Sequence, residues 1–100
     1  FRRVLFRSKN MLNELFEIIE ERKANPTEKS YTASLFAEGE DRILQKIGEE
    51  ATEVIIAAKG QGDDRIIEEV SDLFYHTLVL LSAKGLSLSD VESELRKRHK

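Results

Sequence analysis

The sequence predicts an all-α fold, a bundle of four to five helices that a second copy of the chain completes. Apolar residues recur at intervals of three and four along most of the chain. The only proline follows the first of these segments, and glycines or short polar stretches separate the others. One hundred residues suffice for a single small domain.

The first helical segment begins at Asn10 and ends before Pro26, because the residue preceding a proline is driven out of the α region. Its apolar stripe consists of Met11, Leu12, Leu15, Phe16, Ile18 and Ile19. After a polar loop, Ser30 is placed to cap a short helix that runs through Ala37 and stops at Gly39.

Two long helices are expected next, from about Glu40 to Lys59 and from about Asp64 to Ala83. The connection around Gly62 is short, so the two helices should be antiparallel neighbours. The second is apolar around most of its circumference, and one small chain cannot readily enclose such a helix. We therefore expect a homodimer.

A last helix begins around Leu88, and the spacing Ser89-x-x-Glu92 predicts a capping box at its start. Its basic C-terminal residues suit the negative end of a helix. They lack interleaved aromatic residues, which argues against a nucleic-acid-binding arm.

The two long helices carry paired carboxylates, Glu50 with Glu53 and Glu69 with Asp72. Residues three apart lie on one helix face, because each residue turns the chain by about 100°. Acidic pairs are common on solvated faces, but Glu50 borders an apolar sector, which favours a functional role. Four carboxylates facing one another repel unless a divalent cation neutralises them. Oxygen-only carboxylate ligands favour magnesium, manganese or calcium over zinc or copper, and of these we expect magnesium, with manganese as the alternative.

Residues beside these pairs are candidates for further roles. A carboxylate-held divalent metal is suited to binding a polyphosphate, whose phosphorus a water molecule can then attack. Glu49 lies on the side away from the apolar sector, so we expect it to orient or deprotonate that water. Lys46 precedes Glu50 by one turn and would bind phosphate, or only form an i,i+4 ion pair. His76 follows Asp72 by one turn, and we expect that carboxylate to hold its ring. His76 would contact substrate rather than ligate the metal.

Ser30, Tyr31 and Thr32 bring hydroxyl groups to a helix start, where free backbone N–H groups favour anions. They are candidates for contact with phosphate or ribose. The alternative is that they only cap the helix.

The motif Glu49-Glu50-x-x-Glu53, followed by Glu69-x-x-Asp72, resembles the MazG-like superfamily of all-α nucleoside-triphosphate pyrophosphohydrolases. Within it, Ser30-Tyr31-Thr32, the run at 46–53 and the run at 72–76 are similar to the phosphoribosyl-ATP pyrophosphatases of histidine biosynthesis. The resemblance covers residues 10–100. It implies magnesium-dependent hydrolysis of phosphoribosyl-ATP to phosphoribosyl-AMP and pyrophosphate. A house-cleaning nucleotide pyrophosphatase and a catalytically silent dimerisation module stay open as alternatives.

Composition bears on the binding partners and the cellular location of the protein. The net charge is only −3, with basic and acidic residues interspersed, so no nucleic-acid or membrane partner is expected. The absence of cysteine agrees with a cytoplasmic location. Residues 1–9 are basic and apolar without helical periodicity. We interpret them as a linker behind a cyclohydrolase domain, to which this family is often fused, or as non-native adapter-derived sequence.

Overall fold

The computed structural model describes residues 10–99, in which all regular secondary structure is helical. The five helices are α1 (Met11–Ala24), α2 (Tyr31–Glu38), α3 (Glu40–Gly60), α4 (Asp63–Ala83) and α5 (Leu88–Arg98). The predicted all-α class is confirmed, and the expected ends of the first four helices agree to within one residue. The interpretation of residues 1–9 as a linker or non-native segment lies outside the described residues.

The helix starts show why local sequence predicted them well. The Asn10 side chain accepts a hydrogen bond from the backbone N–H of Asn13 at 2.9 Å, and the Asn13 side chain accepts one from the backbone N–H of Asn10. The Ser30 hydroxyl likewise accepts from the N–H of Ala33 at 3.0 Å. Gly39 has a φ of 103°, which permits one residue both to end α2 and to begin α3. Each cap satisfies backbone groups that the helix leaves unpaired.

The capping box of α5 was predicted at the wrong serine. Ser87 caps the helix, accepting from the N–H of Asp90 at 3.2 Å, while the Asp90 carboxylate accepts from the Ser87 N–H at 2.9 Å. The Ser89 hydroxyl contacts that of Ser87 instead. Gly85, with a φ of 73°, turns the chain out of α4, so Ser87 is the residue that reaches the extended conformation a cap needs.

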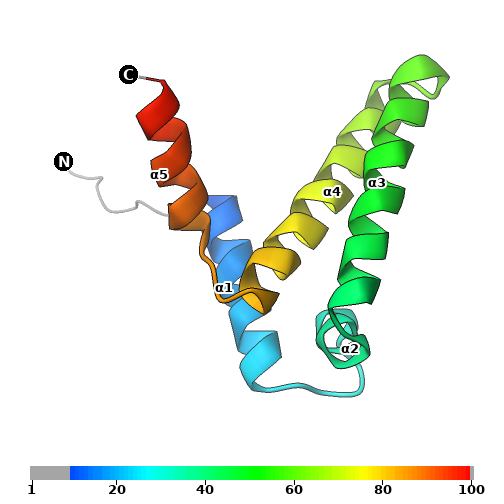
Figure 1. The fold of residues 1–100 in the computed structure, drawn as a ribbon. Coiled ribbons are helices and arrows are strands. Elements are labelled where there is room, and N and C mark those ends of the chain that lie inside the picture. The colour runs from blue at the N-terminus through cyan, green and yellow to red at the C-terminus, as the bar shows by residue number, and fades with distance from the viewer. Residues whose placement is uncertain (1–9, 100) are drawn as a thin grey trace.

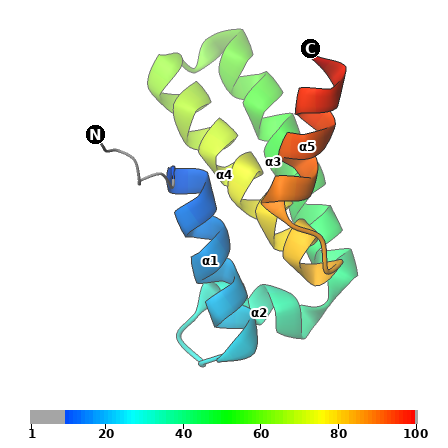
Figure 2. The same cartoon turned by 90° about the vertical axis from the view of Figure 1, so that its left-hand side faces the viewer.

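Helices α3 and α4 form a long antiparallel hairpin closed by Gln61 and Gly62 (Figure 1). This hairpin is one arm of a V, and α1 with α5 lies along the other, while α2 sits at the base. The view turned by 90° shows α1 running alongside the lower half of α4 (Figure 2). The hairpin sets the acidic residues of α3 opposite those of α4.

The core lies at the base of the V, where α1 and α2 pack against the hairpin. Its fully buried members are Ile19, Leu35, Ile43, Leu78 and Val79. Burying one such side chain contributes about 1.5–3 kcal/mol. A polar contact fixes the same region, since Lys23 donates to the backbone carbonyl of Ser82 at 2.7 Å and the Ser82 hydroxyl donates to Glu20. This core holds α2 against the hairpin and α1.

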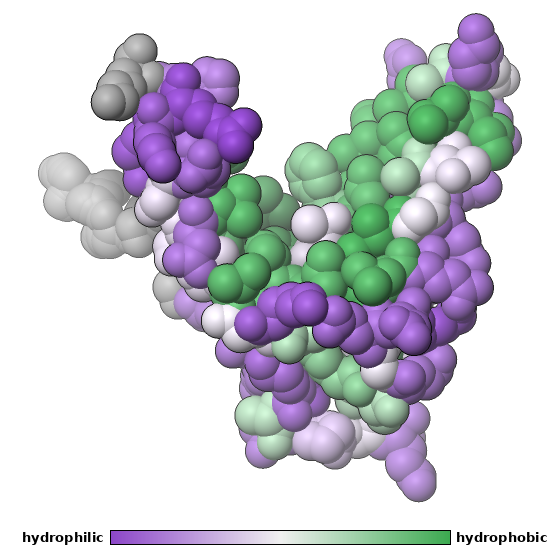
Figure 3. All heavy atoms as spheres, viewed as in Figure 1, coloured by the Kyte–Doolittle hydropathy of each residue, from purple (hydrophilic) through white to green (hydrophobic). Residues whose placement is uncertain are grey.

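The inner surface of the V is apolar. A groove of about 530 Å³ lies between α4 and the other arm, and Figure 3 shows hydrophobic side chains along it. Leu73, Phe74, Leu81, Val91 and Leu95 are among the residues that line it. Phe74 is 49% exposed. None of the described helices is long and apolar enough to cross a membrane.

Candidate active site

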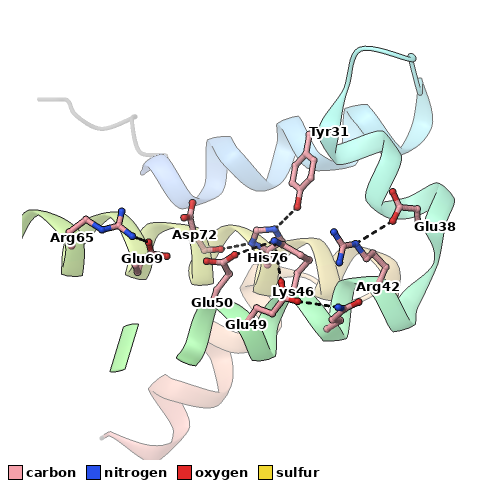
Figure 4. A network of polar contacts seen from close by, with 11 residues as sticks. Tyr31, Glu38, Arg42, Lys46, Glu49, Glu50, Arg65, Glu69, Asp72 and His76 are labelled. Atoms are coloured by element: carbon pink, nitrogen blue, oxygen red, sulfur yellow. Dashed lines mark hydrogen bonds and ion pairs between the residues drawn. The ribbon is translucent and has the colours of Figure 1, made fainter. Parts of the chain in front are cut away.

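The hairpin brings three carboxylates together. Ligand oxygens of Glu50, Glu69 and Asp72 all lie within 4.8 Å of one another, and Figure 4 shows the three side chains converging between α3 and α4. Glu69 is buried, Glu50 is partly buried and Asp72 is exposed. Glu53, one turn after Glu50, is partly buried but lies outside this group. Three of the four residues predicted as metal ligands are thus in reach of one ion.

This donor set fits a hard divalent cation. All three groups offer oxygen, and no histidine or cysteine of the described chain joins them. Carboxylate oxygens at this spacing suit magnesium or manganese, which prefer oxygen ligands. Glu69 is only 5% exposed, so its charge calls for a close partner.

Lys46 lies over the α3 side of the group. Its ammonium is 3.4 Å from carboxylate oxygens of both Glu49 and Glu50, so the predicted i,i+4 ion pair is present and Glu49 shares it. Burial lowers the pKa of Lys46, but the Tyr31 oxygen and Glu50 raise it by a larger sum. Lys46 therefore carries its charge at neutral pH. Glu49 also accepts from the side-chain amide of Gln45 at 3.0 Å.

Arg65 occupies the corresponding place on α4. Its guanidinium forms ion pairs with both Glu68 and Glu69, one turn later on the same helix. The Glu69 side chain is 7% exposed, whereas that of Glu68 is 59% exposed. Sequence analysis did not single out Arg65, although its i,i+4 spacing to Glu69 was visible.

His76 links the carboxylates to α2. Its Nδ1 is 2.7 Å from the backbone carbonyl of Asp72, which can only accept, so Nδ1 carries the proton. The Tyr31 hydroxyl then donates to Nε2 at 3.1 Å. The expectation that the Asp72 carboxylate holds the ring was wrong: the carbonyl four residues back lies closer to a ring on the same helix. The Asp72 carboxylate is left for the acidic group.

The hydroxyl residues of α2 have different partners. Ser30 caps the helix, as the structural alternative predicted. Thr32 shares a hydrogen bond with the hydroxyl of Tyr75, whose ring stacks on Tyr31 with centroids 6.2 Å apart. Burial raises the pKa of Tyr75. Sequence analysis missed Tyr75, and only the packing of α2 on α4 reveals it.

Comparison with known proteins adds an independent observation. Residues 12–99 match the family model described as phosphoribosyl-ATP pyrophosphohydrolase. The chain is 53% identical over 89 residues to the phosphoribosyl-ATP pyrophosphatase of Clostridium acetobutylicum, covering 89% of this chain and 81% of that one. It is 53% identical over 90 residues to the same-named protein of Bacillus mycoides, covering 90% and 84%.

A longer relative contains the same region. The chain is 54% identical over 90 residues to the histidine biosynthesis bifunctional protein HisIE of Caldanaerobacter subterraneus subsp. tengcongensis. The match covers 90% of this chain and 44% of that protein. Because the family model matches residues 12–99, the similarity extends over nearly all of this chain, including α2, α3 and α4, which carry the candidate site.

Proposed function

Since the chain belongs to the phosphoribosyl-ATP pyrophosphohydrolase family, we propose that it hydrolyses phosphoribosyl-ATP to phosphoribosyl-AMP and pyrophosphate in histidine biosynthesis. The observation that carries this proposal is the convergence of Glu50, Glu69 and Asp72 beside Lys46. A phosphoric anhydride needs its negative charge offset before water can attack, and this arrangement provides for that. We expect the enzyme to work in the cytoplasm.

Glu50, Glu69 and Asp72 would hold a magnesium ion, or manganese in its place. When bound, such an ion polarises phosphoryl oxygens and offsets the charge that develops on them. Glu53 is the expected fourth ligand. It follows Glu50 by one turn on α3 and so lies on the same helix face.

Lys46 would bind a phosphate oxygen of the substrate. Its ammonium pairs with two carboxylates but has three donors, so one is left for substrate. Tyr31, held by His76, would orient the nucleotide at the α2 side of the site, with Ser30 and Thr32 at the same helix start. His76 then acts on the substrate through Tyr31, because its own two nitrogens are engaged.

Glu49 is the proposed general base. It sits at the edge of the acidic group, 48% exposed, and shares Lys46 with Glu50. Its exposure gives it access to water. A positioned base of this kind contributes about 10²-fold or more to the rate.

The assembly we propose is a homodimer. The exposed Ile67 and Phe74 both lie on α4 of the hairpin. Phe74 also lines the apolar groove that runs beside α4. An arm of one protomer lying in the groove of another would cover both surfaces at once in a two-fold arrangement. A second copy is the fitting occupant because it offers both the arm and the groove.

The test is pyrophosphate release from phosphoribosyl-ATP, measured with magnesium beside a panel of ordinary nucleoside triphosphates. We expect turnover of phosphoribosyl-ATP well above that of any member of the panel. Activity confined to the panel would assign the chain to the house-cleaning pyrophosphatases instead. No activity on either, with the helical circular dichroism intact, would favour the silent dimerisation module.

A further inference from the structure

Arg65 has no role in the proposed reaction, yet it contacts the most buried carboxylate of the site. Its guanidinium bridges Glu68 and Glu69, the outer and inner of two consecutive carboxylates on α4. Figure 4 shows the contact with Glu69. The Arg65 side chain is 43% exposed, whereas the Glu69 side chain that it contacts is only 7% exposed. Arg65 therefore stands between solvent and the acidic group.

We propose that Arg65 is the built-in counter-ion of the metal site: it neutralises Glu69 before the divalent ion binds and thereby limits how tightly that ion is held. The proposal rests on the metal site described above and adds to it a residue that sets its affinity. The juxtaposition of Arg65 with Glu69, and of Glu69 with Glu50 and Asp72, is what carries it.

The electrostatic argument has two parts. Before the cation binds, three carboxylates within 4.8 Å repel one another, and Glu69 is nearly out of water. Arg65 offsets this repulsion and so stabilises the cation-free protein. Once a dication is present, the same guanidinium repels it and draws electron density from a ligand oxygen. Both parts act in one direction, toward weaker metal binding.

Lys46 shows that the arrangement is repeated. It pairs with Glu49 and Glu50 at the same three- and four-residue spacing that joins Arg65 to Glu68 and Glu69. Each helix of the hairpin thus supplies one basic side chain, which pairs with a proposed metal ligand and with the carboxylate that precedes that ligand in the sequence. Lys46 faces Tyr31 and the substrate side, whereas Arg65 lies further along the hairpin toward its turn. Arg65 is therefore the one whose charge can be removed without touching the proposed phosphate contact.

The experiment is calorimetric titration of manganese alone into the wild type, Arg65→Gln and Arg65→Lys. Glutamine removes the charge and keeps most of the length, so we expect manganese to bind about fivefold tighter or more. Lysine keeps the charge, so its affinity should stay closer to that of the wild type. The gain in Arg65→Gln should shrink as salt is added, because the repulsion acts through partly exposed groups.

Arg98→Gln is the matched control, since Arg98 forms a similar i,i+4 ion pair with Glu94 far from the site on α5. It should leave manganese affinity unchanged. The cation-free Arg65→Gln protein should also melt at a lower temperature than the wild type and regain that loss when manganese is added. If Arg65 only braced the helix, affinity would not change, and if it aligned Glu69 for ligation, affinity would fall.

Unchanged or weaker binding in Arg65→Gln would therefore overturn the inference. That result differs from a failure of the proposed metal site itself. In that case the wild-type chain would take up no manganese, and both the metal site and the role of Arg65 would be refuted. Should the cation-free variant be unfolded, all three titrations are repeated in an osmolyte such as trimethylamine N-oxide, which restores the folded state. Tighter manganese binding in Arg65→Gln than in Arg65→Lys then supports the proposal, and equal or weaker binding refutes it.

Discussion

Replacing Glu50 with glutamine tests the metal site most directly. The Glu50 side chain is 12% exposed, its carboxylate belongs to the group within 4.8 Å, and Gln preserves its shape while removing one charge. Without the cation, the variant should be as stable as the wild type or more so, because one repelling charge is gone. Lys46 keeps Glu49 as a partner.

The magnitude follows from ligand linkage. At a magnesium concentration about 100 times the dissociation constant, binding stabilises the wild type by about 2.7 kcal/mol. For a domain of about 100 residues, that corresponds to a rise in Tm of about 11–22 °C. Removing a residue that only holds a metal ligand in place weakens metal affinity by up to about 100-fold. Removing a ligand itself should weaken it by at least that factor. Stabilisation then falls to about 0.4 kcal/mol and the Tm rise to about 2–3 °C.

The assay is thermal unfolding by circular dichroism with and without magnesium, together with pyrophosphate release. Glu94→Gln is the control, because Glu94 is a helical glutamate paired with Arg98 outside the acidic group. It should keep the full magnesium response. If Glu50→Gln retained most of the wild-type Tm rise and turnover, Glu50 would not be a ligand and the site would have to be sought elsewhere.

Three further predictions follow from the site and its surroundings. Glu49→Gln should lower the catalytic rate by about 10²-fold, with a smaller loss of manganese affinity than Glu53→Gln; equal losses by calorimetry would make Glu49 a ligand instead. Tyr31→Phe leaves Nε2 of the buried His76 without its donor and should cost about 1–3 kcal/mol in urea unfolding, and no loss would mean that solvent replaces the hydroxyl. Ile67→Lys places a charge on an exposed apolar residue and should yield monomers in sedimentation velocity, whereas an unchanged dimer would move the interface elsewhere.

Much of the fold could be predicted because its signals are local. Asn10 and Ser30 cap helices through contacts three residues away, and Pro26 ends the first segment by its effect on the preceding residue. The start of α5 shows the limit of such signals. Ser87 and Ser89 each precede an acidic residue by three positions, so spacing fits both equally, and only the turn at Gly85 decides between them.

The candidate site divides in the same way. Helical spacing alone puts Lys46 over Glu50 and Arg65 over Glu69, since each pair is four residues apart on one helix. A short hairpin connection was enough to predict that the acidic residues of α3 meet those of α4. Spacing could not tell that Glu53 lies outside the group, because that depends on how far the two helices are rotated about their axes.

Sequence by itself determined the helices, the caps of α1 and α2, and the charged faces that the helices present, because each of these depends on residues within about one helical turn. The tertiary structure decided which side chains of α2 reach the hairpin. Tyr31 and His76 are 45 residues apart, and Thr32 and Tyr75 are 43 apart, so neither contact leaves a periodic pattern in the chain. They exist because Leu35 of α2 is buried in one core with Ile43 of α3 and Val79 of α4, and only the packing of that whole core sets how α2 lies on the hairpin.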